Sequence, residues 1–165
     1  MARPVDLRSL QRQLVAAVLL ILIESGLGMY VNLFVTIPAG HSGASPSNYL
    51  SGSGRSLLWS VEHGGATLAI HAVLGVLLGL MVIGIVAGAI RSARQAIWLW
   101  SVIGALMVIG AGFNGASFLD YDKDASSLIM ALLAFGAIAC FVIVLFLVSQ
   151  PPPALEPTTE GEIAS

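Results

Sequence analysis

The stretch "GGATLAIHAVLGVLLGLMVIG", residues 64–84, decides the fold of this chain. Apart from one imidazole, at His71, it reads as a helix that faces lipid. An ionisable group inside such a span is energetically costly in the membrane, and it therefore indicates a functional site. The question that follows is which residues elsewhere in the chain surround His71.

The composition places the chain among integral membrane proteins. Of its 165 residues, 57% are hydrophobic and 10% are charged, whereas about 25% of an ordinary soluble domain is charged. A helix needs about 20 apolar residues to cross a bilayer. Four runs of this kind occur, at residues 14–37, 66–90, 96–118 and 125–149. We expect residues 1–149 to form an all-α, four-helix, up-and-down bundle, because short connections make successive helices antiparallel neighbours.

Basic residues are unevenly distributed about these spans. Five arginines lie at one end of them: Arg3, Arg8, Arg12, Arg91 and Arg94. Only Arg55 and Lys123 are expected at the other end. Short loops that carry many Lys and Arg residues stay in the cytoplasm. We therefore predict a multi-pass protein of the cell membrane, in contact with the lipid bilayer, with both termini cytoplasmic.

The connections differ in length and composition. The outer loop, residues 38–65, is the longest, and its Gly, Ser and Pro content predicts irregular structure. Its last part, "RSLLWSVEH" at residues 55–63, favours a short helix at the membrane interface, with Trp59 as an aromatic anchor. The tail, residues 150–165, is rich in proline and acidic, and this composition is typical of disorder.

Glycines recur in the second and third spans at spacings that favour close helix contacts. They are Gly75, Gly79, Gly84 and Gly88 in the second span, and Gly104, Gly110, Gly112 and Gly115 in the third. Gly75 has a further property, because it lies one turn from His71 on the same helix face. A glycine at that position could leave room for a flat ligand.

One side chain from each span falls in a common layer, about 6 to 8 Å below the outer boundary at 1.5 Å per residue. These side chains are Asn32, His71, Asn114 and Met130. One interpretation is a hydrogen-bond network that fixes the packing of a non-catalytic scaffold or accessory subunit. In that case Met130 is only a space-filling side chain.

A second interpretation is a haem in the bundle, ligated by His71 and by Met130 or a histidine of the outer loop. Bundle cofactor sites are built from side chains on facing helices, and His/Met is a known axial pair. Gly75, Asn32 and Asn114 would then line the site. Four outer residues could meet the haem propionates: Arg55, His63, His41 and Tyr49.

The segment "LAIHAVLG", residues 68–75, resembles the L-x-x-H-x-x-x-G helices of four-helix membrane haem proteins, such as the b-type cytochromes and each half of haem A synthase. The resemblance extends to the four-span layout. It implies a b-type haem that serves electron transfer or haem sensing. Those families typically supply paired histidines from different helices. Here the other three spans contain no histidine, so the second ligand would be Met130 or a histidine of the outer loop.

A third interpretation keeps a metal and omits the porphyrin. Imidazole and thioether ligands together suit copper. The residues that could supply them near the outer side are His41, His63, His71, Met29 and Met130.

Glu24 is the formally charged residue within the first span, about 15 Å from the inner end of its helix. Gly28 and Asn32 follow at four-residue steps and form a stripe toward the bundle interior. Glu24 could be a protonated hydrogen-bond donor to Ser25 or to the backbone. It could instead be a proton relay beside a quinol. Such a site would suit a quinol or another redox partner. It would also suit a chain that belongs to an oligomer or a larger membrane complex.

Other function classes find no support in the sequence. There is no phosphate loop, no G-x-S-x-G elbow and only one cysteine, Cys140, so an enzyme is not indicated. The net charge is -2 and the second connection is short, which argues against nucleic-acid binding.

Overall fold

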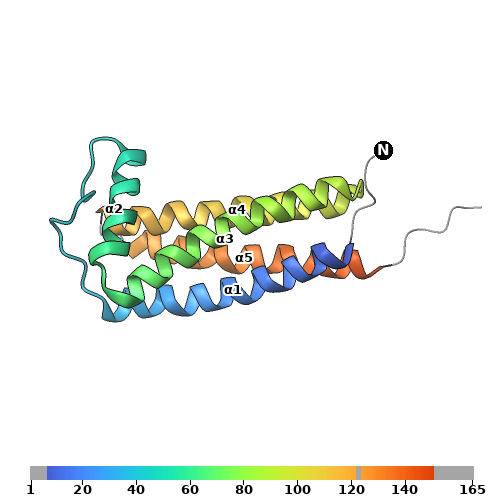
Figure 1. Cartoon of the computed structure of the whole chain (residues 1–165), viewed down its shortest axis with the longest axis horizontal. Helices are drawn as coiled ribbons and strands as arrows, with labels where there is room; N and C mark the ends of the chain where they lie inside the picture. Colours follow the sequence, from blue (N-terminus) through green and yellow to red (C-terminus); the bar gives the residue numbers. More distant parts are fainter. Residues whose placement is uncertain (1–6, 122–123, 151–165) are drawn as a thin grey trace, which may run out of the picture.

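The computed structural model describes residues 7–121 and 124–150, and within them the chain folds entirely into helices and connections. The helices are α1 (Leu7–Phe34), α2 (Tyr49–His63), α3 (Gly65–Arg91), α4 (Gln95–Tyr121) and α5 (Asp124–Ser149). Four of them, α1, α3, α4 and α5, are long and apolar enough to cross a membrane. The all-α membrane bundle is therefore confirmed. Figure 1 shows these four helices side by side along one axis, with α2 across one end.

The bundle has two ends. The α2 end carries α2, the end of α4 and the start of α5, and the tail end carries the start of α1 and the end of α5 (Figure 1). Arg3, Lys123 and the tail from residue 151 lie outside the described residues, so their predicted positions are not addressed by the structure.

Helix α1 begins seven residues before the predicted span and ends at Phe34 rather than at Ile37. The early start has a physical reason. Arg8, Gln11 and Arg12 make the first turns polar on average, yet Leu10 and Leu14 on the opposite face are 3% and 0% exposed. Apolar residues at i and i+4 share one helix face. This face is buried in the bundle, so the helix extends beyond the purely apolar run.

The hydrophobic core fills the tail half of the bundle. Its fully buried members come from the first half of α1, the second half of α3, the first half of α4 and the second half of α5. The largest are Phe141, Leu14, Ile21, Ile85 and Ile97. Near the α2 end, the buried hydrophobic residues among those described are only Val31 and Leu68. The two halves of the bundle are thus packed differently.

The glycines with the closest neighbours in the bundle core are in α4 and α5, whereas most of those in α3 face open space. A Cβ atom at Gly104 would lie 2.6 Å from Phe141 Cε1, and one at Gly136 would lie 2.7 Å from Met107 Sδ. At Gly75, Gly79 and Gly84 an added Cβ would meet nothing within 4 Å. The close contacts expected for Gly79 and Gly84 are therefore wrong, because both face open space instead of a neighbouring backbone, whereas the open space at Gly75 is the room that was expected there.

Helix α2 begins at Tyr49, six residues before the predicted start at Arg55. The side chain of Asn48 accepts a hydrogen bond from Ser51 N at 3.1 Å and so caps the first turn. The Gly and Ser content of this region suggested a loop. The serine hydroxyl groups of α2 instead donate hydrogen bonds to nearby backbone oxygens or to Asp120, so these residues are compatible with a helix.

A buried carboxylate fixes α2 to the end of α4. Asp120 is 2% exposed and accepts hydrogen bonds from Ser56 Oγ at 2.6 Å and Ser53 Oγ at 2.9 Å. Its backbone oxygen accepts from Ser45 N at 2.8 Å. Tyr49 OH donates to Phe113 O at 2.6 Å. We call these four contacts the α2 clamp.

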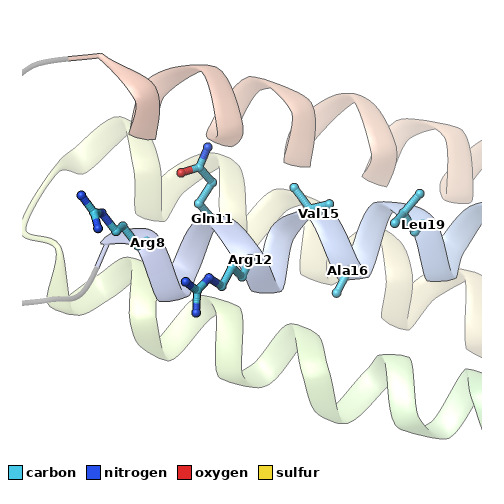
Figure 2. A pocket seen from close by; sticks show the side chains of 6 residues that line it. All are labelled: Arg8, Gln11, Arg12, Val15, Ala16 and Leu19. Atoms are coloured by element: carbon cyan, nitrogen blue, oxygen red, sulfur yellow. The ribbon is translucent and has the colours of Figure 1, made fainter.

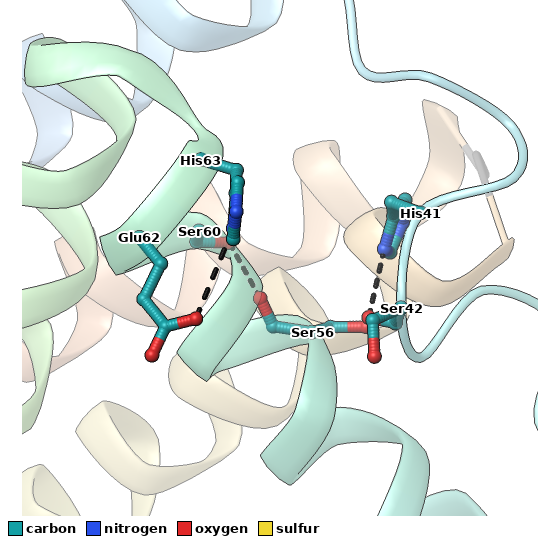
Figure 3. Close-up of polar contacts among 6 residues, drawn as sticks. All are labelled: His41, Ser42, Ser56, Ser60, Glu62 and His63. Atoms are coloured by element: carbon teal, nitrogen blue, oxygen red, sulfur yellow. Dashed lines mark hydrogen bonds and ion pairs between the residues drawn. The ribbon is translucent and has the colours of Figure 1, made fainter.

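The loop before α2 packs on the same surface. His41 is 8% exposed and stacks on Trp59, with ring centroids 4.6 Å apart. Its ring nitrogens face Leu119 O at 3.0 Å and Ser42 O at 3.1 Å; Figure 3 shows the second contact. Figure 3 also shows Ser60 Oγ donating to Ser56 O within α2. Trp59 therefore packs against the loop that precedes its own helix.

Candidate functional site

A cavity of about 860 Å³ occupies the half of the bundle that the hydrophobic core leaves open. All five helices contribute to its wall. Helix α2 covers it with Leu50, Ser53, Gly54 and Leu57, and most of the remaining wall is apolar. Ligand cavities in proteins commonly span about 300 to 1,000 Å³ and combine apolar walls with a few polar groups. The volume and the lining are thus those of a site for an organic ligand.

Two polar side chains of the cavity wall, Glu24 of α1 and His71 of α3, lie in contact with each other. Glu24 Oε2 lies 2.5 Å from His71 Nδ1, and the two side chains are 9% and 22% exposed. The distance is that of an ion pair, but the geometry is not that of a hydrogen bond. Glu24 Oε1 is buried without a hydrogen-bond partner in the described part of the chain. The pair therefore retains unused polar capacity beside the cavity.

Gly28 brings His71 and Met130 close to one another. A Cβ atom at position 28 would lie 3.2 Å from His71 Cε1, 3.5 Å from His71 Nε2 and 3.5 Å from Met130 Cε. On the other side of Met130, a Cβ atom at Gly115 would lie 3.2 Å from its sulfur. Glycines on α1 and α4 thus make room for a histidine and a thioether that come from two other helices.

The predicted polar layer is arranged differently from a hydrogen-bond network. Asn32 lines the cavity but is exposed at its edge. Asn114 donates from Nδ2 to Gly110 O of its own helix at 2.9 Å, and it is not part of the cavity wall. The side chain that joins His71 to another helix is Glu24, not either asparagine. Gly75 lines the cavity and has open space beside it, as a ligand would need.

The outer residues expected around haem propionates do not line the cavity. Arg55 is exposed on α2, and His63 is exposed with its Nδ1 3.8 Å from Glu62 Oε2 (Figure 3). His41 and Tyr49 bind backbone oxygens of α4. Within residues 7–121 and 124–150, no group of three His, Cys, Asp or Glu side chains is placed to hold a metal. His41 and His63, the other histidines of the copper interpretation, are not part of the cavity wall that contains His71.

Sequence reasoning missed two parts of the site. Glu24 was assigned to mid-membrane without a partner, and His71 to a layer nearer the outer surface. A usable signal existed, because Glu24 is the acidic group of the first span and His71 is the basic group of the second. Asp120 was not predicted to have a structural role. The signal in the sequence was a carboxylate at the end of an apolar run, but the serines that it binds lie in α2, which is close to it only in the folded structure.

Fold and site together define the class of this protein: an all-helical, membrane-spanning bundle with a ligand-sized cavity near one end. No protein-family model matches the chain, and the searches of curated proteins and of solved structures found no significant match. Its function must therefore be inferred from the geometry of the site.

Proposed function

We propose that this chain is a b-type haem-binding membrane protein that serves electron transfer or haem sensing, with His71 as an axial ligand. The contact of Glu24 with His71 Nδ1 carries this proposal. Histidines that ligate metals usually present their other ring nitrogen to a carboxylate, which fixes the tautomer and orients the ring. In this arrangement Nε2 is the ligating atom, and it lies on the part of the ring that faces Gly28.

Met130 is the second ligand in this proposal. Its methyl group and the His71 ring approach the same glycine, so the two side chains meet at one place although they come from α5 and α3. Replacing Gly28 by any larger residue would fill this place. A His/Met pair supplies one nitrogen and one sulfur to haem iron and raises its reduction potential.

The cavity provides room for the rest of the group. Gly75 and Gly112 line it, and neither has an atom within 4 Å of its added Cβ position. Ser53 and Asn32 supply polar groups toward the α2 end of the wall, where propionates would be hydrated. Arg55 and His63 are not among the residues that line the wall, so we assign the propionate contacts to Ser53 and Asn32.

The orientation in the membrane is also a proposal. Four arginines, Arg8, Arg12, Arg91 and Arg94, occur at the tail end, and this end is cytoplasmic under the positive-inside rule. The haem then lies in the outer half of the cell membrane, and both termini are cytoplasmic. A quinol in the membrane or a redox protein outside it would be the electron-transfer partner, within a complex or oligomer where one forms.

The absorption spectrum of the detergent-purified protein, before and after reduction with dithionite, tests this function. We expect an intense Soret band that sharpens and shifts on reduction. His71→Ala should abolish the band, whereas His63→Ala, at an exposed histidine outside the cavity, should leave it unchanged.

Protein that stays colourless after expression in cells supplied with haem would contradict the haem assignment. In that case metal analysis would separate a copper protein from a scaffold. If His71→Ala lowered thermal stability without any change in the spectrum, the Glu24–His71 pair would serve helix packing alone.

A further inference from the structure

A second hollow lies on the surface of α1, between the tail end and Leu19, and shares no lining residue with the cavity at His71. It encloses about 530 Å³ and is lined by Arg8, Gln11, Arg12, Val15, Ala16 and Leu19. Figure 2 shows these side chains along the face of α1 that lies between the ribbons of α5 and α3. All six are exposed. The hollow is therefore open to the surrounding membrane.

Its two ends have different chemistry. Arg8, Gln11 and Arg12 occupy the first two turns, where α1 leaves the apolar region, and each carries hydrogen-bond donors. Val15, Ala16 and Leu19 continue the same face for about one further turn into the apolar span. A polar, cationic mouth thus leads into an apolar groove.

The charge at this end has one sign. The charged side chains that the structure describes at the tail end are Arg8, Arg12, Arg91 and Arg94. The first turn of α1 contains no acidic residue. Arg12 has no ion-pair or hydrogen-bond partner among residues 7–121 and 124–150. The exposed guanidinium of Arg12 is thus available to an anionic ligand.

We propose that this hollow binds an anionic phospholipid, with the phosphate at Arg8 and Arg12 and one acyl chain along Val15, Ala16 and Leu19. Guanidinium groups suit phosphate because they present several donors in a planar fork. Basic pockets on membrane helices near the cytoplasmic surface are known to hold anionic headgroups. The apolar half of the hollow distinguishes a lipid from a soluble anion, which would use only the arginines.

Native mass spectrometry of the detergent-purified full chain tests the proposal. Phosphatidylglycerol and phosphatidylcholine with identical acyl chains are added in separate titrations. We expect one phosphatidylglycerol to be retained in preference to phosphatidylcholine. Arg12→Gln should lower its affinity about fivefold, and Arg8→Gln combined with Arg12→Gln about 30-fold. Arg91→Gln removes the same charge from another helix at this end, and it should have little effect.

Four results would overturn the proposal. Equal retention of both lipids would show that the charge is not recognised, and an equal loss with Arg91→Gln would show only a general surface potential. Displacement of the lipid by millimolar glycerol phosphate would show that the apolar groove is not used. If the full chain showed no preference for phosphatidylglycerol and the chain without residues 151–165 did, the acidic tail rather than a lipid would be the partner of the arginines. The haem spectrum is read on the same samples, so the two sites are tested separately.

Discussion

Glu24 and His71 face each other across the α1–α3 interface, with Oε2 of the carboxylate 2.5 Å from Nδ1 of the imidazole. Each is the ionisable residue of an otherwise apolar span. Their contact lowers the free-energy cost of placing each side chain in the membrane. A buried charge is tolerated in a membrane when it is paired. The same contact has a consequence for a metal bound at the opposite ring nitrogen, because a carboxylate on Nδ1 makes the imidazole a stronger electron donor.

The first prediction concerns Glu24. Glu24→Gln keeps the size of the side chain but removes its charge, so His71 becomes a weaker donor to iron. We expect a higher haem reduction potential and a loss of about 10- to 100-fold in haem affinity. A redox titration and a haem-retention assay measure these two effects. Glu62→Gln is the matched control, because Glu62 is exposed beside His63. An unchanged potential would argue against ligation through His71.

The second prediction concerns the room beside His71. Gly28→Leu places a side chain where a Cβ atom already lies 3.2 Å from the His71 ring, so it should expel the ligand. Overpacking of this kind costs about 1 to 3 kcal/mol of stability. A Cβ atom at Gly26, two residues away, would meet nothing within 4 Å, so Gly26→Leu should retain the haem. The ratio of Soret to protein absorbance compares the two variants. Equal haem content in both would mean that the ligand does not occupy this part of the cavity.

The third prediction concerns the second ligand. Met130→Leu preserves most of the apolar volume but removes the sulfur, and thioether ligation raises the potential of haem iron. We therefore expect a lower potential and an altered reduced spectrum, with the haem still bound through His71. Met107→Leu is the control, because Met107 packs against Gly136 and is not part of the cavity wall. If only the Met107 variant changed the spectrum, the assignment of Met130 would be wrong.

The fourth prediction concerns the α2 clamp. Ser56→Ala removes the 2.6 Å hydrogen bond to Asp120 and leaves part of a buried carboxylate unsatisfied, at a cost of about 1 to 3 kcal/mol. We expect the amides of residues 49–63 to exchange hydrogen faster, while exchange in α5 stays unchanged. Ser51→Ala removes only a local bond to Asn48 O at an exposed position, so it should have a smaller effect. Uniform acceleration throughout the bundle would point to global destabilisation instead.

Hydropathy was sufficient to predict the four spans, because each has to satisfy its backbone internally and expose apolar side chains to lipid. The helix ends were harder to place. Averaging over a window hid Leu10 within an arginine-rich turn, and the Gly and Ser residues of α2 suggested a loop. Both elements depend on contacts with distant residues, and these cannot be read from a local pattern.

The candidate site was predictable in its components more than in its arrangement. His71, Met130 and Gly75 were singled out by residue type, and all three line the cavity. The pairing of Glu24 with His71 was missed because depth was estimated along each helix separately, as though the helices ran parallel from a common level. Gly28 was placed on the correct face of α1. Its role between His71 and Met130 depends on the relative position of three helices, which no single span contains.

The α2 clamp has a consequence for the order of events during synthesis. Ser56 and Asp120 are 64 residues apart in the sequence, and translation adds about 5 to 20 residues per second. For roughly 3 to 13 seconds after α2 is made, its anchor has not yet been synthesised. During that interval α2 has no partner to dock on, and because all of α5 (Asp124–Ser149) is made after Asp120, the anchor of α2 is complete before the wall of the cavity is.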